Sequence, residues 1–146
     1  MQRKTIDIPN RKKASWQVFD QIAPTYDRIN KVLSMGTDIL WRKNFRKQLP
    51  DGQKLKCIDL ATGTADVAIE LAKDSRVSRV VGTDLSKDMI DFGKIKVQRS
   101  KNKDKITLKL GDGVTIPEKT ASYDVITVAF GIRNFPDYKT SLKNMV

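Results

Sequence analysis

One short segment carries the residue types most suited to chemistry. An apolar run over residues 55–60 leads into Ala61-Thr62-Gly63-Thr64-Ala65-Asp66, and a helical pattern begins at Val67. A strand that turns through small residues into a helix is typical of nucleotide-binding sites, because Gly63 permits a sharp turn and close approach of a ligand to the backbone. Asp84 ends the next apolar run. An acid about 20 residues after such a glycine accepts hydrogen bonds from ribose hydroxyls, so the two features predict a nucleoside site.

The charge of the loop limits which ligand fits. A dinucleotide site reads G-x-G-x-x-G and rests a pyrophosphate on the helix N-terminus. This loop has one glycine and is flanked by Asp59 and Asp66, whose charges would repel a pyrophosphate. S-adenosylmethionine fits better, because its sulfonium is positive and its amino group meets a carboxylate. A strand–turn–helix of some other α/β protein stays open on this pattern alone.

Another acid follows a later apolar run. Asp112 lies in Gly111-Asp112-Gly113, after residues 106–110. Ligands of open α/β sheets bind outside the carboxyl ends of the strands, so we expect Asp112 to accept from an adenine amino group. Asp-Gly is also a common turn pair, and that interpretation stays open. For Asp59, a cofactor contact and a role in organising the loop are both open.

The segment that follows the fourth apolar run adds two polar side chains. Arg133 stays charged and is unsuited to accepting a proton, but it can stabilise a developing oxyanion or orient a water, with Asn134 fixing the geometry. The alternative is that Arg133 pairs with a structural carboxylate.

Composition excludes several classes of protein. The chain has 146 residues, of which 39% are hydrophobic, and no apolar run approaches the roughly 18 residues of a membrane span. It contains no histidine, which removes most zinc sites and every Ser-His or Cys-His nucleophile, so we expect no metal. Cys57 is the single cysteine, and we expect a cytoplasmic setting.

The charge is strongly positive. Lysine and arginine number 28 against 17 acids, which gives a net charge of +11. Basic residues cluster at 11–13, 42–47 and 94–105. Such a surface favours phosphates of nucleic acid or of an anionic membrane, and a merely solvated face is the alternative.

Apolar periodicity places these residues on elements. We predict strands over 55–60, 79–84, 106–110 and 123–130, and we expect the last to be buried on both faces. We predict helices over 65–73, 86–99 and 138–146. Ser86 is the expected N-cap of the second helix, and Leu142 and Met145 should point inward from the third. The βαβα order predicts an α/β fold with a parallel, doubly wound sheet. We divide the chain into a basic flexible N-terminus (1–13), a helical segment (14–50) that covers the substrate, and an α/β domain (51–146) that we expect to be incomplete after its fourth strand.

Three separated motifs resemble one family. They are Val18-Phe19-Asp20-Gln21-Ile22-Ala23-Pro24-Thr25-Tyr26-Asp27-Arg28-Ile29-Asn30, the loop at 59–66 with the turn at 83–86, and Phe130-Gly131-Ile132-Arg133-Asn134. Together they resemble the ubiquinone/menaquinone biosynthesis C-methyltransferases, with demethylmenaquinone methyltransferases nearest.

The resemblance implies a Rossmann-like class I fold and S-adenosylmethionine-dependent methylation of a ring carbon in a polyprenylated quinol. It implies that Thr64, Asp84, Asp112 and Gly113 contact the cofactor, with Gly63 and Asp59 in support. Ala129 stands where some members have serine, and Ala65 replaces a frequent glycine.

The resemblance and the chemistry together suggest a mechanism. A quinol hydroxyl has a pKa near tyrosine's, about 10, and its ionisation makes the adjacent ring carbon nucleophilic. We expect Arg133 and Asn134 to stabilise this phenolate. Tyr26 and Asp27 would come from the covering helices, with Asp27 as a proton acceptor.

The partner predictions follow from the substrate. We expect the N-terminal helices to contact the inner face of the membrane peripherally, and we expect no nucleic-acid partner. Whether the chain forms a homodimer stays open.

Two rival functions remain: a methyltransferase for nucleic acid or another small molecule, and an inactive cofactor-binding fragment. A base amino-methyltransferase would show Asn/Asp-Pro-Pro-aromatic after the fourth strand, where this chain has Phe130-Gly131-Ile132-Arg133-Asn134.

Overall fold

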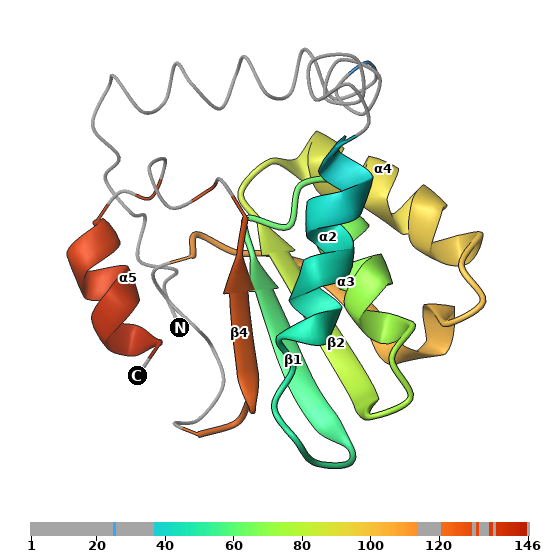
Figure 1. The fold of residues 1–146 in the computed structure, drawn as a ribbon. Helices are drawn as coiled ribbons and strands as arrows, with labels where there is room; N and C mark the ends of the chain where they lie inside the picture. Colours follow the sequence, from blue (N-terminus) through green and yellow to red (C-terminus); the bar gives the residue numbers. More distant parts are fainter. Residues whose placement is uncertain are drawn as a thin grey trace.

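The computed structural model describes residue 25 and residues 37–113, 121–129, 131, 135 and 137–145, without the side chains of residues 37–39, 41 and 144 (Figure 1). Within these residues four strands form one sheet: β1 (Leu55–Leu60), β2 (Val77–Asp84), β3 (Ile106–Leu110) and β4 (Val125–Val128). Their order is β3-β2-β1-β4 and every pairing is parallel, which confirms the predicted parallel α/β sheet.

The described helices are α2 (Thr37–Lys47), α3 (Asp66–Ala72), α4 (Lys87–Gln98), the short 3₁₀ helix η1 (Lys103–Lys105) and α5 (Tyr138–Asn144). Of these, α3 connects β1 to β2, and α4 with η1 connects β2 to β3, as the predicted alternation requires. The Oγ of Ser86 accepts a hydrogen bond from the backbone N–H of Met89 at 3.2 Å, which confirms Ser86 as the N-cap of α4.

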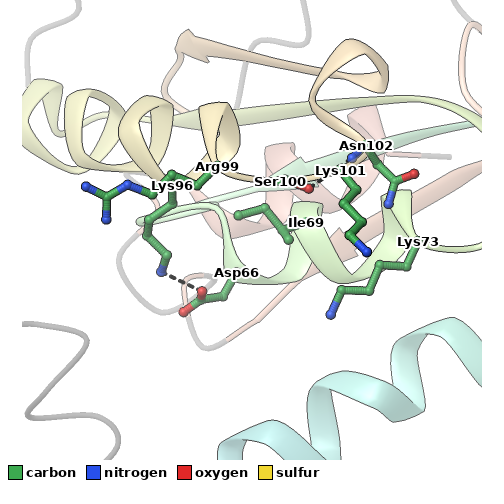
Figure 2. Close-up of a pocket in the computed structure, with 8 residues that line it drawn as sticks. All are labelled: Asp66, Ile69, Lys73, Lys96, Arg99, Ser100, Lys101 and Asn102. Atoms are coloured by element: carbon green, nitrogen blue, oxygen red, sulfur yellow. Dashed lines mark hydrogen bonds and ion pairs between the residues drawn. The ribbon is translucent and has the colours of Figure 1, made fainter.

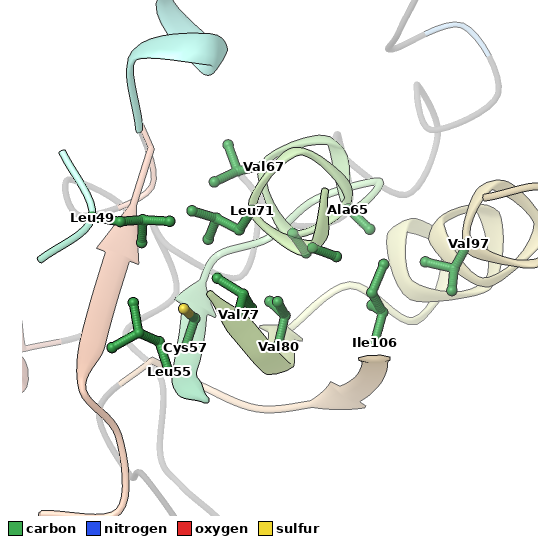
Figure 3. Packing of buried hydrophobic residues seen from close by; sticks show 12 residues of the cluster. Leu49, Leu55, Cys57, Ala65, Val67, Leu71, Val77, Val80, Val97 and Ile106 are labelled. Carbon is green, nitrogen blue, oxygen red and sulfur yellow. The ribbon is translucent and has the colours of Figure 1, made fainter. Parts of the chain in front are cut away.

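The central strand β1 separates two apolar clusters. Cys57 and Val80 face α3 and α4, where they join Leu71, Val97 and other buried residues (Figure 3). Ile58 and Val81 face the opposite side and pack with Leu60 and Phe135. Successive strand residues point to opposite faces, so neighbouring positions in β1 and β2 serve different clusters.

A single arginine holds α2 against the amino end of β2. The guanidinium of Arg76 donates to the carbonyl oxygens of Arg46, Leu49 and Pro50, at 3.3 to 3.4 Å. Carbonyls at a helix C-terminus have no partner inside the helix, so Arg76 both satisfies them and fixes where α2 lies.

Three expectations need correction. β4 spans Val125–Val128 and is only partly buried, because it lies at an edge of the described sheet and has a neighbour on one side. β2 begins at Val77, two residues before the predicted start. Leu142 is 45% exposed rather than inward, although Met145 packs against the second cluster as expected.

Candidate cofactor site

Asp84 joins the ends of three strands at the carboxyl edge of the sheet. Its Oδ2 accepts from the backbone N–H of Gly63 at 2.8 Å, and its Oδ1 accepts from the N–H of Ser86 at 3.0 Å. Its own carbonyl accepts from the N–H of Gly111 at 2.9 Å. Gly63 and Asp84, each predicted to contact a nucleoside ligand, are therefore in direct contact with one another.

The loop between β1 and α3 has an unusual backbone. Ala61, Gly63 and Ala65 have φ values of 54°, 56° and 70°, which lie in the left-handed region. Only glycine adopts this region without cost, so the two alanines carry roughly 1–2 kcal/mol of strain each. A side chain at Gly63 would meet no atom within 4 Å, so the loop faces open space there. This is the room that a ligand approaching the backbone requires.

Asp59 lies beneath the loop and is 1% exposed. Its two oxygens accept from the hydroxyls of Thr62 at 2.7 Å and Thr127 at 2.6 Å. Burial raises the pKa of Asp59 from 3.8 to about 6, and these hydrogen bonds oppose the rise. The structure therefore supports a loop-organising role for Asp59, because the carboxylate links the loop to β4.

Asp66 does not face the loop as the sequence suggested. Its carboxylate pairs with Arg42 of α2 at 2.7 Å and with Lys96 of α4 at 2.5 Å. The expectation that Asp66 repels a pyrophosphate is therefore wrong, because two cations compensate its charge. Lys96 also donates to the hydroxyl of Thr64 at 2.9 Å, and Thr64 is 3% exposed. The Thr64 side chain is thus directed toward α4.

Asp112 and Gly113 follow β3 at the same edge, and both are buried. Gly113 has φ 69°, and a Cβ there would lie 2.6 Å from the ring of Phe135. The ring therefore requires glycine at this position. The structure brings five of the six predicted cofactor residues to the carboxyl ends of β1, β2 and β3, and it places the sixth, Asp59, just below them.

Two loops meet closely at the end of β1. A Cβ at Gly131, which follows β4, would lie 2.2 Å from the Cβ of Ala61. Gly131 belongs to the same motif as the predicted site residues Arg133 and Asn134. Tyr26, Asp27, Arg133 and Asn134 themselves lie outside the described residues, so their predicted roles stay predictions.

Sequence reasoning missed three polar side chains that shape the site. Thr62 and Thr127 hold Asp59, and Lys96 holds Thr64. Thr127 was detectable as a lone polar residue in an apolar strand. Its register is also informative, since it pairs with Asp59 across β1 and β4. Lys96 gave no signal, because it stands in a lysine-rich helix.

The described part of the chain has neither a membrane-spanning helix nor a cluster of metal-binding side chains. No helix there has both the length and the apolar content needed to cross a membrane. No group of three or more cysteine or acidic side chains there could hold a metal ion.

A parallel sheet with a glycine turn after β1 and an acid ending β2 is a Rossmann-like, nucleotide-binding arrangement. A solved structure of a putative S-adenosyl-L-methionine-dependent methyltransferase from Methanococcus maripaludis shares this fold with a TM-score of 0.65 at 23% identity, over 99% of this chain and 60% of that one. The ubiE/COQ5 methyltransferase family matches residues 8–146, and the chain belongs to this family.

The names of curated relatives agree with this family membership. The ubiquinone/menaquinone biosynthesis C-methyltransferase UbiE of Geotalea uraniireducens is 42% identical over 130 residues, which cover 88% of this chain and 55% of the relative. The demethylmenaquinone methyltransferase of Bacteroides fragilis is 38% identical over 129 residues, or 88% and 53%. The chain spans about half the length of the curated relatives it matches.

Proposed function

We propose that this chain supplies the S-adenosylmethionine-binding part of an enzyme that methylates a ring carbon of a polyprenylated quinol, in menaquinone or ubiquinone biosynthesis. Family membership and the names of the curated relatives support the reaction. One observation of the structure supports the proposed cofactor: Asp84 contacts the Gly63 loop at the point where that loop faces open space. The residues present fit the nucleoside part of this ligand, since Asp84 and the Gly63 turn lie together at the carboxyl ends of the strands.

Each cofactor residue takes a defined part in this proposal. Asp84 accepts from the ribose hydroxyls, because it ends β2 beside the glycine turn. Asp112 and the backbone of Gly113 bind the adenine. Thr64 contributes its backbone, since its hydroxyl is held by Lys96. Asp59 fixes the loop from below.

The reaction needs a carbon nucleophile. S-adenosylmethionine supplies an electrophilic methyl group when bound. Arg133 and Asn134 stabilise the quinol oxyanion, and Asp27 and Tyr26 act from the N-terminal segment. These four roles rest on the family resemblance. The division at residues 13 and 50 rests on charge and apolar periodicity, and the cytoplasmic setting rests on the single cysteine, Cys57. Contact of the basic N-terminal helices with an anionic membrane rests on their charge and on a substrate that lies in the bilayer. Homodimer formation stays open.

Calorimetric titration with S-adenosylhomocysteine tests the site. We expect the chain to bind it, and Asp84→Asn to weaken binding at least tenfold, because an amide nitrogen cannot accept from Gly63 or from ribose. Asp88→Asn is the matched control: it makes the same charge change at an exposed position in the first turn of α4. If the unaltered chain does not bind S-adenosylhomocysteine, the inactive-fragment hypothesis is favoured. If both variants lose the same affinity, Asp84 does not contact the cofactor.

A further inference from the structure

Helix α4 lies close against the loop that carries Gly63. A Cβ at Gly93 would lie 3.3 Å from the carbonyl carbon of Thr64 and 3.4 Å from the Cβ of Ala65, so this glycine lets the helix approach the loop backbone. Lys96 lies three residues further along, on the same face of α4. At Gly63, by contrast, the loop faces open space. Lys96 and a ligand at Gly63 would therefore contact different residues of the loop.

Lys96 holds the two residues that flank Ala65. Its ammonium donates to the hydroxyl of Thr64 at 2.9 Å and to Oδ1 of Asp66 at 2.5 Å, and Figure 2 shows the lysine directed from α4 toward Asp66. Arg42 already pairs with Asp66 at 2.7 Å, so neutralising that carboxylate does not by itself require a lysine. The contact with Thr64, which is 3% exposed, therefore points to a role in the loop itself.

Ala65, between these two anchors, has a strained backbone. It is the N-cap of α3, with φ 70° and ψ 21°, and its methyl group cannot cap the helix as a polar side chain would. A residue with a Cβ pays a steric cost in this left-handed region and stays there only where its surroundings fix it. Hydrogen bonds from one ammonium to both neighbours are suited to fixing this turn.

We propose that Lys96 is a positioning residue, which keeps the cofactor loop in its binding shape by holding Thr64 and Asp66 around the strained turn at Ala65. The inference rests on the proposed function, because the loop in question is the one that would bind S-adenosylmethionine. In this role Lys96 acts without touching the ligand: it raises the fraction of molecules whose loop is ready to bind. Apparent affinity is proportional to that fraction, so loss of the lysine weakens binding.

Amide hydrogen exchange tests the hold on the loop without any ligand. The backbone N–H of Ala65 donates to the carbonyl of Thr62 at 3.0 Å, so its exchange rate reports opening of the turn. In Lys96→Met this amide should exchange about tenfold faster, while the amides of β1, which report on the whole fold, should keep their rates. Lys94→Met is the matched control: it makes the same substitution at an exposed position of α4, whose ion pair with Asp91 is 3.9 Å long, and should change neither. An unchanged rate at Ala65, or equal acceleration at Ala65 and in β1, would show that the lysine does not position the turn.

A second substitution separates this role from general stabilisation. Glycine takes the left-handed backbone of residue 65 without strain, so Ala65→Gly should make the lysine less necessary. In calorimetric titration with S-adenosylhomocysteine, Lys96→Met should weaken binding about tenfold in the unaltered chain and less than about threefold when Ala65→Gly is also present. A tenfold loss in both backgrounds would overturn the proposal, because the lysine would then act independently of the turn.

The two measurements keep this inference separate from the cofactor site itself. If the unaltered chain does not bind S-adenosylhomocysteine, the proposed function fails, and amide exchange still decides whether Lys96 holds the loop. If the unaltered chain binds and Lys96→Met binds equally well, the cofactor site stands and the positioning role is wrong. Should Lys96→Met not fold, Thr64→Val replaces it: this variant removes one of the two hydrogen bonds at nearly constant shape, and it should give smaller changes in the same direction.

Discussion

At the scale of single residues, Asp59 is costly to the fold and useful to the site. A carboxylate that is 1% exposed and has a pKa raised to about 6 is destabilised as an anion, even with two threonine hydroxyls bonded to it. It persists, we infer, because it ties the Gly63 loop to β4. A buried acid with this role should leave a mark on stability as a function of pH.

Asp59→Asn should raise the free energy of unfolding at pH 8 and leave it unchanged below pH 4. Since the pKa of Asp59 is higher in the folded protein (about 6) than its usual 3.8, the folded state holds the extra proton between these values. Stability from this group therefore falls as pH rises from 4 to 6 and is level above. The shift of about two units corresponds to about 3 kcal/mol as an upper value.

The measurement is urea unfolding of both proteins from pH 4 to pH 8, with Asp88→Asn as the exposed control. The difference in free energy of unfolding between variant and parent reports on Asp59 alone. Other acids change stability with pH in the opposite direction; the pKa of Asp74, for example, is lowered by its hydrogen bond with Arg76. A difference that does not grow with pH would contradict the assignment.

Ala61 and Gly131 are matched in size across two loops. Gly131→Ala would bring two Cβ atoms to 2.2 Å and should destabilise the protein by about 1–3 kcal/mol, the usual cost of overpacking. Adding Ala61→Gly removes the clash and the strain at φ 54°, so the double variant should recover most of the loss. Thermal unfolding of the two single variants and the double variant gives the coupling energy. Additive losses would show that the loops do not touch.

At the scale of elements, α2 is held to α3 by charge. Arg42 pairs with Asp66 at 2.7 Å, and one turn later Arg46 approaches Glu70 at 3.6 Å. Asp66 begins α3 directly after the loop, and Lys96 reaches it from α4. Three helices therefore meet at the residue that follows the candidate cofactor loop, so the position of α2 and the shape of the loop should depend on each other.

Arg42→Gln should lower the free energy of unfolding by about 1 kcal/mol, because the pair is partly buried and Asp66 keeps Lys96. Amide exchange in α2 should become faster, since the helix loses a tertiary contact. Arg46→Gln is the matched control: its ion-pair distance is longer and this arginine is more exposed than Arg42, so the loss should be at most about 0.5 kcal/mol. Hydrogen exchange and urea unfolding measure both effects, and a larger loss in the control would refute the ranking.

At the scale of the whole molecule, net charge opposes folding. With 28 basic and 17 acidic residues, the chain carries +11 at neutral pH. Self-repulsion of this size destabilises a compact state, and ordinary salt screens it beyond about 10 Å. Short ion pairs such as Arg42–Asp66 are screened less because they are partly buried.

Raising sodium chloride from 20 to 500 mM should therefore increase the melting temperature. A gain of about 1 kcal/mol corresponds to a rise of roughly 2–4 °C for a chain of this size. A fall in melting temperature on calorimetry would mean that screened ion pairs outweigh the repulsion.

Local sequence patterns were sufficient to predict the secondary structure and the parallel order of the strands. The bounds of β1 and β3, the Ser86 cap and the turn at Gly63 all follow from short stretches of chain, since strand alternation, helix capping and glycine turns are decided by neighbouring residues. The parallel order then places the carboxyl ends of the strands at one edge of the sheet.

Tertiary packing decided the rest. The pairing of Asp66 with Arg42 and Lys96 and the hydrogen bond from Thr127 to Asp59 join residues that lie far apart in the chain. Which cation reaches a given acid depends on how elements pack in space. That information is absent from any short window of sequence.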